Sequence, residues 1–455
     1  MESLNPSGYT AVLKNRNFLA LWLAQVLSLT ALNGSFFLQL ILIEQATGSS
    51  AHLGAVIISF SLPAVLLSAL AGLIVDRVSK KTILVASNGL RIITGAALAL
   101  LAALLLTNKV NEALFLTTIY VLVFVTSAIG QFFAPAEGSM IPLLVRSENL
   151  LPANSLFTIT FTAAQILGMV ILAPLGVKLI GLVPALWVAV AAYVVATLLV
   201  ALLPRDATHR ESIGGVSALR RAWNEVREGW QFAISHRAIF VALLQLSLVS
   251  ALTMIMAMLA PGYAARVLGL QAEDATYVFA PAGVGMLFAS ILVGRFGHRV
   301  SREILASAGM MGMALAVAGL AWAGNGSLIF GKPLFVGHPE LFVSTSAWVM
   351  IFSLIIGMTM ATVNIPAQTI VQERSSDAVR GRVLAVQFTL ANLVAIPPML
   401  FLGNLADIYG IPTVTLVIGL VIAAFAVADL TWALARYRAA RLRHSAHSHS
   451  SETRL

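Results

Sequence analysis

The segment DRVSKKTIL, residues 76–84, returns later in the chain as HRVSREIL, residues 298–305, with the triplet Arg-Val-Ser in common. A second echo lies at nearly the same offset, because Met140-Ile141-Pro142 is matched by Asn364-Ile365-Pro366. Each echo alone is weak. Two echoes at nearly one offset indicate a chain built from two duplicated halves.

The composition around these echoes is that of a membrane protein. Of the 455 residues, 59% are hydrophobic and only 10% are charged, whereas soluble domains carry about 25% charged residues. A protein of this length with so few charged residues could not cover its surface for water, so its surroundings must be lipid. The chain has no cysteine, which excludes disulfides, thiolate zinc sites and cysteine nucleophiles. We therefore predict an all-α integral membrane protein without a metal site or a cofactor.

Each repeated loop lies between two long apolar runs. A membrane-spanning helix needs about 20 mainly apolar residues, and a barrel strand would alternate over only about ten. Twelve runs meet the requirement for a helix. They lie near 17–45, 52–75, 82–106, 113–135, 152–178, 182–203, 237–265, 275–297, 303–323, 344–370, 382–406 and 412–435.

Lysine and arginine predict the orientation, because cytoplasmic loops carry most of the positive charge. With both termini in the cytoplasm, nearly all of the 28 Lys and Arg residues fall on the inner side. The exceptions are Lys109, Lys178, Lys332 and Arg266 outside and Arg91 within a span. This pattern accounts for the net charge of +9 without a nucleic-acid partner. We expect a multi-pass protein of the inner (plasma) membrane.

The longest inner loop divides the spans six and six. The expected organisation is a six-helix bundle at 1–203, a linker at 204–236, a second bundle at 237–436 and a disordered tail at 437–455. Transporters built from two parallel six-helix halves are known, so we expect a pseudo-twofold axis along the membrane normal and a central cavity. Apolar linker residues at helical spacing predict an amphipathic helix, either on the membrane face or packed beneath the bundle: Leu219, Trp223, Val226, Trp230 and Ala233.

The run around the first echo resembles the loop signature of the major facilitator superfamily: a glycine, an Asp-Arg pair, then a glycine and two basic residues. Ser79 stands where that signature has its second glycine. The resemblance implies a latch that holds the inner side closed and breaks when it opens. The alternative is that the basic residues only satisfy the charge bias. The latch candidates in the two halves are Gly72, Asp76, Arg77, Lys80, Lys81, Arg295, Arg299 and Arg302.

Other segments resemble the branch of this superfamily that contains macrolide-efflux and siderophore-export proteins. They are Thr47–Ser49, FFAPAEGSMIPLLVRSENLLPANS from Phe132, EGWQFAISHRAI from Glu228 and IPAQTIVQERSSDAVRGRV from Ile365. The resemblance covers essentially the whole chain and implies a drug:proton antiporter. Span five, Gly168–Gly176 with Pro174, resembles a degraded form of a Gly-Pro signature of antiporters, although close helix packing explains it nearly as well.

Ionisable residues within spans are functional suspects, because burying charge in a membrane is costly. The candidates for proton coupling are Glu44, Asp429, Glu137 and Arg91. Arg91 lies near the middle of span three, and its expected partner is Asp76 or Glu137. For Arg91 we favour a structural ion pair over substrate binding. For Asp429, near the inner end of span twelve, pairing with a basic tail residue is the simpler alternative.

The resemblance implies that spans one, four, seven and ten line the cavity. The cavity candidates on spans one, four and seven are Asn33, Gln39, Gln131, Gln245, Met254 and Met258. Neutral amides and flexible methionines suit varied apolar ligands. They argue against phosphate, nitrate or dicarboxylate substrates, which require fixed cations. The alternative is that the amides pair between helices and the methionines fill gaps.

These features predict a monomeric, proton-coupled exporter of small amphiphilic or hydrophobic organic compounds, with protons and the lipid bilayer as its other partners. A lysophospholipid flippase and a siderophore exporter are alternatives, and a non-transporting membrane receptor is a remote one. An enzyme is not expected, since the sequence lacks an HExxH motif and a Gly-x-Ser-x-Gly elbow. A nucleotide-driven pump would need a phosphate-binding loop, which is also missing.

Overall fold

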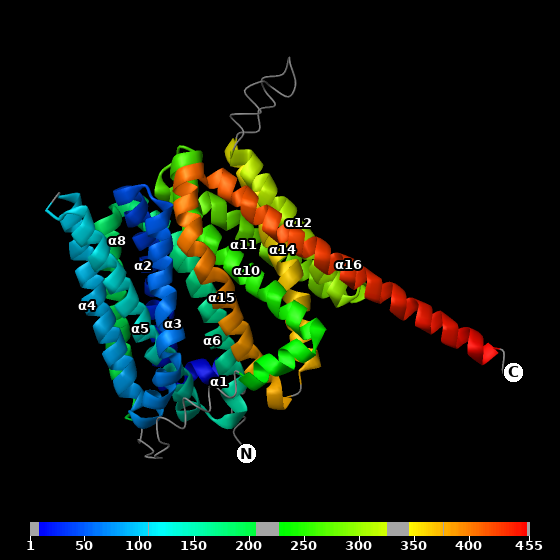
Figure 1. Cartoon of the computed structure of the whole chain (residues 1–455). Coiled ribbons are helices and arrows are strands. Elements are labelled where there is room, and N and C mark those ends of the chain that lie inside the picture. Colours follow the sequence, from blue (N-terminus) through cyan, green and yellow to red (C-terminus); the bar gives the residue numbers. More distant parts are fainter. Residues whose placement is uncertain (1–8, 108, 206–226, 325–344, 376, 453–455) are drawn as a thin grey trace, which may run out of the picture. The chain divides into compact units, whose positions relative to one another are not determined.

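The computed structural model describes residues 9–107, 109–205, 227–324, 345–375 and 377–452. Within these ranges the regular elements are all helical (Figure 1). Twelve of the helices are long and apolar enough to cross a membrane. The predicted class, an all-α protein with twelve membrane spans, is confirmed.

The chain divides into two compact units. Unit 1 comprises Met1–Asn224 and Ala272–Thr276, and unit 2 comprises Glu225–Gln271 and Tyr277–Leu455. The helices of unit 1 are α1 (Tyr9–Lys14), α2 (Arg16–Thr47), α3 (Ser50–Arg77), α4 (Lys80–Leu106), α5 (Glu112–Leu144), η1 (Ser147–Asn149), α6 (Leu150–Gln165), η2 (Ile166–Leu172), α7 (Ala173–Ile180), α8 (Leu182–Ala201) and η4 (Ala272–Ala275).

The helices of unit 2 begin after the linker. They are α10 (Arg237–Gly262), η3 (Tyr263–Val267), α11 (Thr276–Phe296), η5 (Gly297–Arg299), α12 (Arg302–Gly324), α14 (Thr345–Arg374), α15 (Asp377–Tyr409) and α16 (Ile411–Glu452). The last helix continues to Glu452, through the tail for which the sequence predicts disorder. Alanine and arginine recur between 433 and 442, and both are strong helix formers, which accounts for the continuation.

The two units share a packing pattern. The third span of each half packs against the fourth and the sixth: α4 contacts α5 and α8, and α12 contacts α14 and α16. The first span packs against the fifth, as α2 does with α6 and η2, and α10 with α15. The arrangement within each unit therefore repeats along the chain, as the sequence echoes do.

The echoed serines begin corresponding helices. The Ser79 hydroxyl accepts a hydrogen bond from the Thr82 amide at 3.4 Å, and the Ser301 hydroxyl accepts one from the Ile304 amide at 3.4 Å. Serine is a favoured N-cap because its oxygen satisfies an amide that the helix leaves free. Ser79 has φ −53°, so the position needs no left-handed backbone. The serine therefore replaces the glycine of the superfamily signature without strain.

Span five departs from a regular α-helix. It passes from α6 through the π-helix η2 before α7, and Pro174 occupies the start of α7. Proline lacks an N–H and cannot bond the carbonyl four residues earlier, so the preceding turn widens. Gly168 of η2 lies against α2, where a Cβ would come within 2.6 Å of the Thr30 carbonyl oxygen and 2.8 Å of the Gly34 nitrogen. The close approach of α2 and η2 therefore depends on glycine.

The linker enters the described part of the chain at residue 227. Trp230 and Ala233 pack on a buried cluster of unit 2 that includes Ile239, Leu243 and Val371. For these two residues the structure supports a helix packed beneath its own bundle. Leu219, Trp223 and Val226, the other residues of the predicted amphipathic helix, lie outside the described residues.

The outward faces of several helices are apolar. Large hydrophobic side chains remain more than half exposed on α4 and α11, among them Ile93, Leu100, Leu287 and Ile291. In water such faces would associate, whereas in a bilayer they meet lipid chains. On α4 the polar side chains of Asn88 and Arg91 are instead enclosed, and they form one of the polar centres described next.

Candidate functional site

Asp429 of α16 forms a buried polar centre in unit 2. Its side chain is 7% exposed. The Gln245 amide of α10 donates to Asp429 Oδ2 at 2.6 Å, and the Ser307 hydroxyl of α12 lies 2.7 Å from the same oxygen. The hydrogen-bonding partners that the described residues provide are thus both neutral. A carboxyl group held this way is a candidate for taking up and releasing a proton.

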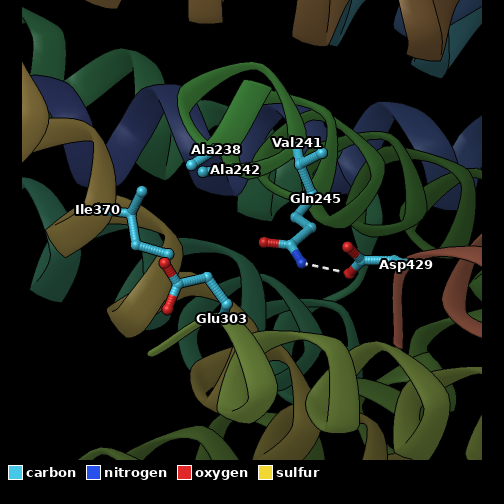
Figure 2. A pocket seen from close by; sticks show the side chains of 7 residues that line it. All are labelled: Ala238, Val241, Ala242, Gln245, Glu303, Ile370 and Asp429. Carbon is cyan, nitrogen blue, oxygen red and sulfur yellow. Dashed lines mark hydrogen bonds between the residues drawn. The ribbon is translucent and has the colours of Figure 1, made fainter. Parts of the chain in front are cut away.

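A small pocket opens beside this carboxyl group. Figure 2 shows its lining side chains, which come from α10, α12, α14 and α16. They are Ala238, Val241, Ala242, Gln245, Glu303, Ile370 and Asp429. The pocket has room for about one water molecule. It is too small for an organic substrate, and its two carboxyl groups make it suitable for a proton or a water molecule.

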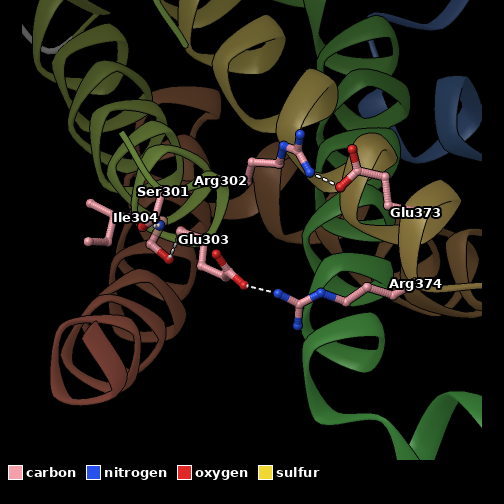
Figure 3. A network of polar contacts seen from close by, with 7 residues as sticks. Ser301, Arg302, Glu303, Ile304, Glu373 and Arg374 are labelled. Carbon is pink, nitrogen blue, oxygen red and sulfur yellow. Dashed lines mark hydrogen bonds and ion pairs between the residues drawn. The ribbon is translucent and has the colours of Figure 1, made fainter. Parts of the chain in front are cut away.

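Two ion pairs join α12 to α14 next to the pocket. Arg302 pairs with Glu373, and Arg374 Nη2 lies 2.5 Å from Glu303 Oε1 (Figure 3). All four side chains are partly exposed. Glu303 therefore lines the pocket together with Asp429 and also pairs with a partly exposed arginine, Arg374.

Unit 1 encloses a second polar centre around Arg91 of α4, which is 1% exposed. Its guanidinium lies 4.5 Å from the ring centre of Phe133 and 3.5 Å from Asn88 Oδ1. Glu137 of α5, 7% exposed, attracts it electrostatically. Ser28 of α2 donates to Asn88 Oδ1 at 2.8 Å. Of the two partners expected for Arg91, the structure shows this interaction for Glu137, while the side chain of Asp76 lies outside the described residues.

This centre leaves hydrogen-bonding atoms unused. Among the described residues, Arg91 Nε, Asn88 Nδ2 and Glu137 Oε1 are buried and have no hydrogen-bond partner. Buried polar atoms are usually paired with protein or ordered water. The centre therefore has spare donors and an acceptor that bound water would satisfy.

The other candidates occupy varied positions. Glu44, near the end of α2, is 5% exposed. Asn33 donates to the Leu29 carbonyl at 2.8 Å, and Gln131 to the Ser127 carbonyl at 3.4 Å, so both amides bond to their own helices. Gln39 is buried at 6% exposed, Met258 is fully buried and Met254 is half-buried. Gln245 is a cavity candidate that the structure connects with a proton-coupling candidate, because its amide donates to Asp429.

The latch candidates are described in part. Lys81 Nζ donates to the Leu203 carbonyl at 2.5 Å, which ties the start of α4 to the end of α8. Arg295 and Arg299 both lie over the ring of Phe296, and Arg302 pairs with Glu373. Arg77 is exposed, and Lys80 is half-buried. The surroundings of Gly72 and the side chain of Asp76 lie outside the described part of the chain.

Four members of the two polar centres were not predicted from the sequence: Ser28, Asn88, Ser307 and Glu303. The signal was present in part, because Asn88 lies one turn before Arg91 and Glu303 one turn before Ser307, so each pair shares a helix face. The sequence does not show which helix packs against each of these faces. Ser307 becomes informative only when α16 brings Asp429 against it.

Comparison with known proteins agrees with this architecture. A family model, the Major Facilitator Superfamily, matches residues 21–397. An uncharacterized MFS-type transporter of Bacillus subtilis (strain 168), YfiS, is 25% identical over 376 residues, which cover 82% of this chain and 83% of that protein. A second, YkuC of the same organism, is 24% identical over 233 residues, which cover 50% of this chain and 51% of that one.

Solved transporters share the fold. The nucleoside transporter NupG superposes with a TM-score of 0.67 at 15% identity, covering 92% of this chain and 98% of that one. A bacterial homolog of the human lysosomal transporter Spinster, in an inward-facing conformation, gives a TM-score of 0.65 at 14% identity, covering 91% and 96%. Together with twelve spans and two units of repeated packing, the family match shows that this chain belongs to the Major Facilitator Superfamily and is a membrane transporter rather than an enzyme.

Proposed function

We propose that the chain is a proton-coupled exporter of small amphiphilic or hydrophobic organic compounds that works by alternating access. One observation carries the coupling part of the proposal. Asp429 is a carboxyl group buried in a membrane span, and its hydrogen-bonding partners among the described residues are the neutral Gln245 and Ser307. A group in such surroundings can gain or lose a proton without breaking an ion pair.

The choice of substrate class rests on the cavity candidates. They are neutral amides and methionines, and the described intramembrane cation, Arg91, is enclosed within unit 1 and attracted to Glu137. An anionic substrate would need an accessible fixed cation. Neutral hydrogen-bonding groups on an apolar surface favour uncharged or amphiphilic compounds.

Transport by inverted membrane vesicles tests the proposal. Vesicles containing the protein are offered a panel of amphiphilic dyes with and without a proton gradient. We expect gradient-dependent dye accumulation by the wild type and its loss in Asp429→Asn at unchanged expression. Glu148→Gln is the matched control, because Glu148 is an exposed carboxylate with 65% of its side chain accessible.

Two results would contradict the proposal. If the wild type accumulates no dye of the panel, the substrate class is wrong, and lysophospholipid or siderophore transport is tested next in the same vesicles. If Asp429→Asn accumulates dye as the wild type does, Asp429 does not couple transport to protons. Glu44 and Glu137 are then the carboxyl groups to test.

The orientation in the inner membrane is also a proposal, and it rests on the distribution of lysine and arginine. The chain has no native cysteine, so single introduced cysteines can report sidedness. We expect a cysteine in place of Ser147 to react only from the cytoplasm, and one in place of Asn111 only from outside. The reverse pattern would place both termini outside.

A further inference from the structure

Hydrogen positions around Asp429 follow from counting donors. A serine hydroxyl has one hydrogen to donate and can accept as well. Ser307 Oγ lies 2.8 Å from the Glu303 main-chain carbonyl oxygen and 2.7 Å from Asp429 Oδ2. The carbonyl oxygen can only accept. If Asp429 were ionised, its oxygen could only accept too, and two acceptors would compete for one hydrogen.

A proton on Asp429 removes the conflict. Oδ2 then donates to Ser307 Oγ, Ser307 donates to the Glu303 carbonyl, and the Gln245 amide donates to Oδ2 at 2.6 Å. Each hydrogen is used once, and each contact at hydrogen-bond distance contains one hydrogen. Figure 2 shows the Gln245 amide aimed at the carboxyl group. We infer that Asp429 is protonated in this structure, and that Glu303 is the proton acceptor through which it exchanges with water.

The position of Glu303 supports the second part of this inference. Its carboxylate and that of Asp429 line the same pocket, which has room for about one bridging water. The Asp429 side chain is buried, whereas 27% of the Glu303 side chain is exposed. Glu303 therefore lies between the buried carboxyl group and solvent. This role deepens the proposed proton coupling and rests on it for its biological purpose.

The proton transfer balances within the groups named. The hydroxyl hydrogen of Asp429 first turns from Ser307 Oγ to the pocket water. The O–H bond of Asp429 then breaks, and the water receives that proton while passing one of its own to the Glu303 carboxylate, which later releases a proton to bulk water. Asp429 ends ionised and Glu303 returns to its charged form. While Glu303 is neutral, Arg374 lacks its partner's charge, so passage of the proton weakens the contact between α12 and α14.

The charged groups around the site are few. Glu303 of α12 lines the pocket and pairs with Arg374 of α14. Arg302 and Glu373 form the neighbouring pair between the same two helices, and Arg237 begins α10. On α16, Asp429 is the one charged residue among the described side chains. On α15, the charged residue among the described side chains is Asp407, which pairs with Arg266. Asp429 thus has Glu303 as the carboxylate that shares its pocket.

Infrared spectroscopy of the full-length protein in lipid nanodiscs tests both parts without a transported substrate. A protonated carboxyl group has a C=O stretching band that an ionised one lacks. We expect such a band at neutral pH in the wild type, its loss in Asp429→Asn, and a shift of its frequency in Ser307→Ala because the acceptor of its hydrogen bond is removed. Size-exclusion chromatography verifies that each variant is folded.

The rate at which the carboxyl proton of Asp429 exchanges with deuterium in heavy water, followed by the shift of this band, tests the route through Glu303. In Glu303→Gln the band should exchange about 100-fold more slowly, the lower limit of what a positioned acid–base group contributes. Glu373→Gln is the matched control, since it loses a carboxylate of the neighbouring ion pair that does not line the pocket. Its exchange rate should equal that of the wild type.

Each part of the inference can fail separately. A wild-type spectrum without a band that Asp429→Asn removes would show that Asp429 is ionised and overturn the first part. Equal exchange rates in Glu303→Gln and the wild type would overturn the role of Glu303. A proton-independent transport result in vesicles, together with the expected infrared bands, would refute the proposed coupling and leave the proton site intact.

Discussion

Replacing Arg91 by methionine tests how strongly the polar centre of unit 1 depends on its charge. Arg91 is 1% exposed and Glu137 is 7% exposed, so the substitution leaves a carboxylate buried without its counter-charge. Glu137 Oε1 has no hydrogen-bond partner among the described residues, so the two side chains attract each other without a hydrogen-bonded ion pair, and leaving a buried polar group unsatisfied costs about 1–3 kcal/mol. We expect Arg91→Met to lower the free energy of unfolding by about 1–3 kcal/mol, a factor of about 5 to 150 in the ratio of folded to unfolded protein.

A second substitution separates the charge from the packing. In Arg91→Met/Glu137→Gln the stranded carboxylate becomes a neutral amide, so most of the lost stability should return. The contact between the guanidinium and the Phe133 ring, at 4.5 Å, is not restored. It contributes about 0.5–2 kcal/mol, which is the deficit that we expect the double variant to keep.

Equilibrium unfolding in mixed micelles, followed by tryptophan fluorescence, measures these differences. Arg146→Met is the matched control, because Arg146 and Glu148 form an exposed pair at 3.8 Å with 72% and 65% of their side chains accessible. Exposed pairs contribute about 0–1 kcal/mol. The reasoning is refuted if Arg91→Met unfolds like the control, or if the double variant is no more stable than Arg91→Met.

Three further predictions concern span packing, the latch and coupling. Gly168→Ala should destabilise unit 1 by about 1–3 kcal/mol through overpacking, because its Cβ would meet the Thr30 carbonyl oxygen at 2.6 Å. Gly138→Ala, with no atom within 4 Å of the added carbon, should be neutral or stabilising. Equal melting curves for the Gly168→Ala and Gly138→Ala variants would disprove the close-packing argument. Asp76→Asn should shift the population towards the inward-open state by about 10- to 100-fold, because a lost charge-assisted bond is worth about 1.5–3 kcal/mol. Cysteines introduced into the inner cavity should then react faster with a thiol reagent than in the wild type. Equal labelling rates would make Asp76 a topological anchor only. Glu44→Gln should abolish gradient-driven dye accumulation in inverted vesicles if Glu44 carries the coupling proton, and normal pumping would remove it from the candidates.

The twelve spans could be predicted because lipid imposes a simple demand on sequence. Each span must be apolar over about 20 residues, and that demand is local, so a run such as 182–203 can be recognised without knowing its neighbours. Ser79 is also a local case. Its role as an N-cap depends only on the Thr82 amide three residues later, although the family signature pointed to a glycine at that position.

The polar centres could not be predicted as assemblies, because their members are distant in sequence. Asp429 was a candidate on its own, but Ser307 is separated from it by 122 residues, and no pattern along α12 marks Ser307 as its partner. The pairing of Glu303 with Arg374 spans 71 residues. Such contacts depend on how far each helix is rotated about its axis, which facing helices decide together.

The neighbouring ion pairs between α12 and α14 carry their charges in opposite order. Arg302 and then Glu303 on one helix meet Glu373 and then Arg374 on the other. If the pairing moved by one residue, either Arg302 would meet Arg374 or Glu303 would meet Glu373, depending on the direction of the shift. Exposed pairs add little stability individually, yet either shift removes two attractions and creates one repulsion. The four residues therefore favour one register of α12 against α14 and disfavour the registers shifted by one residue.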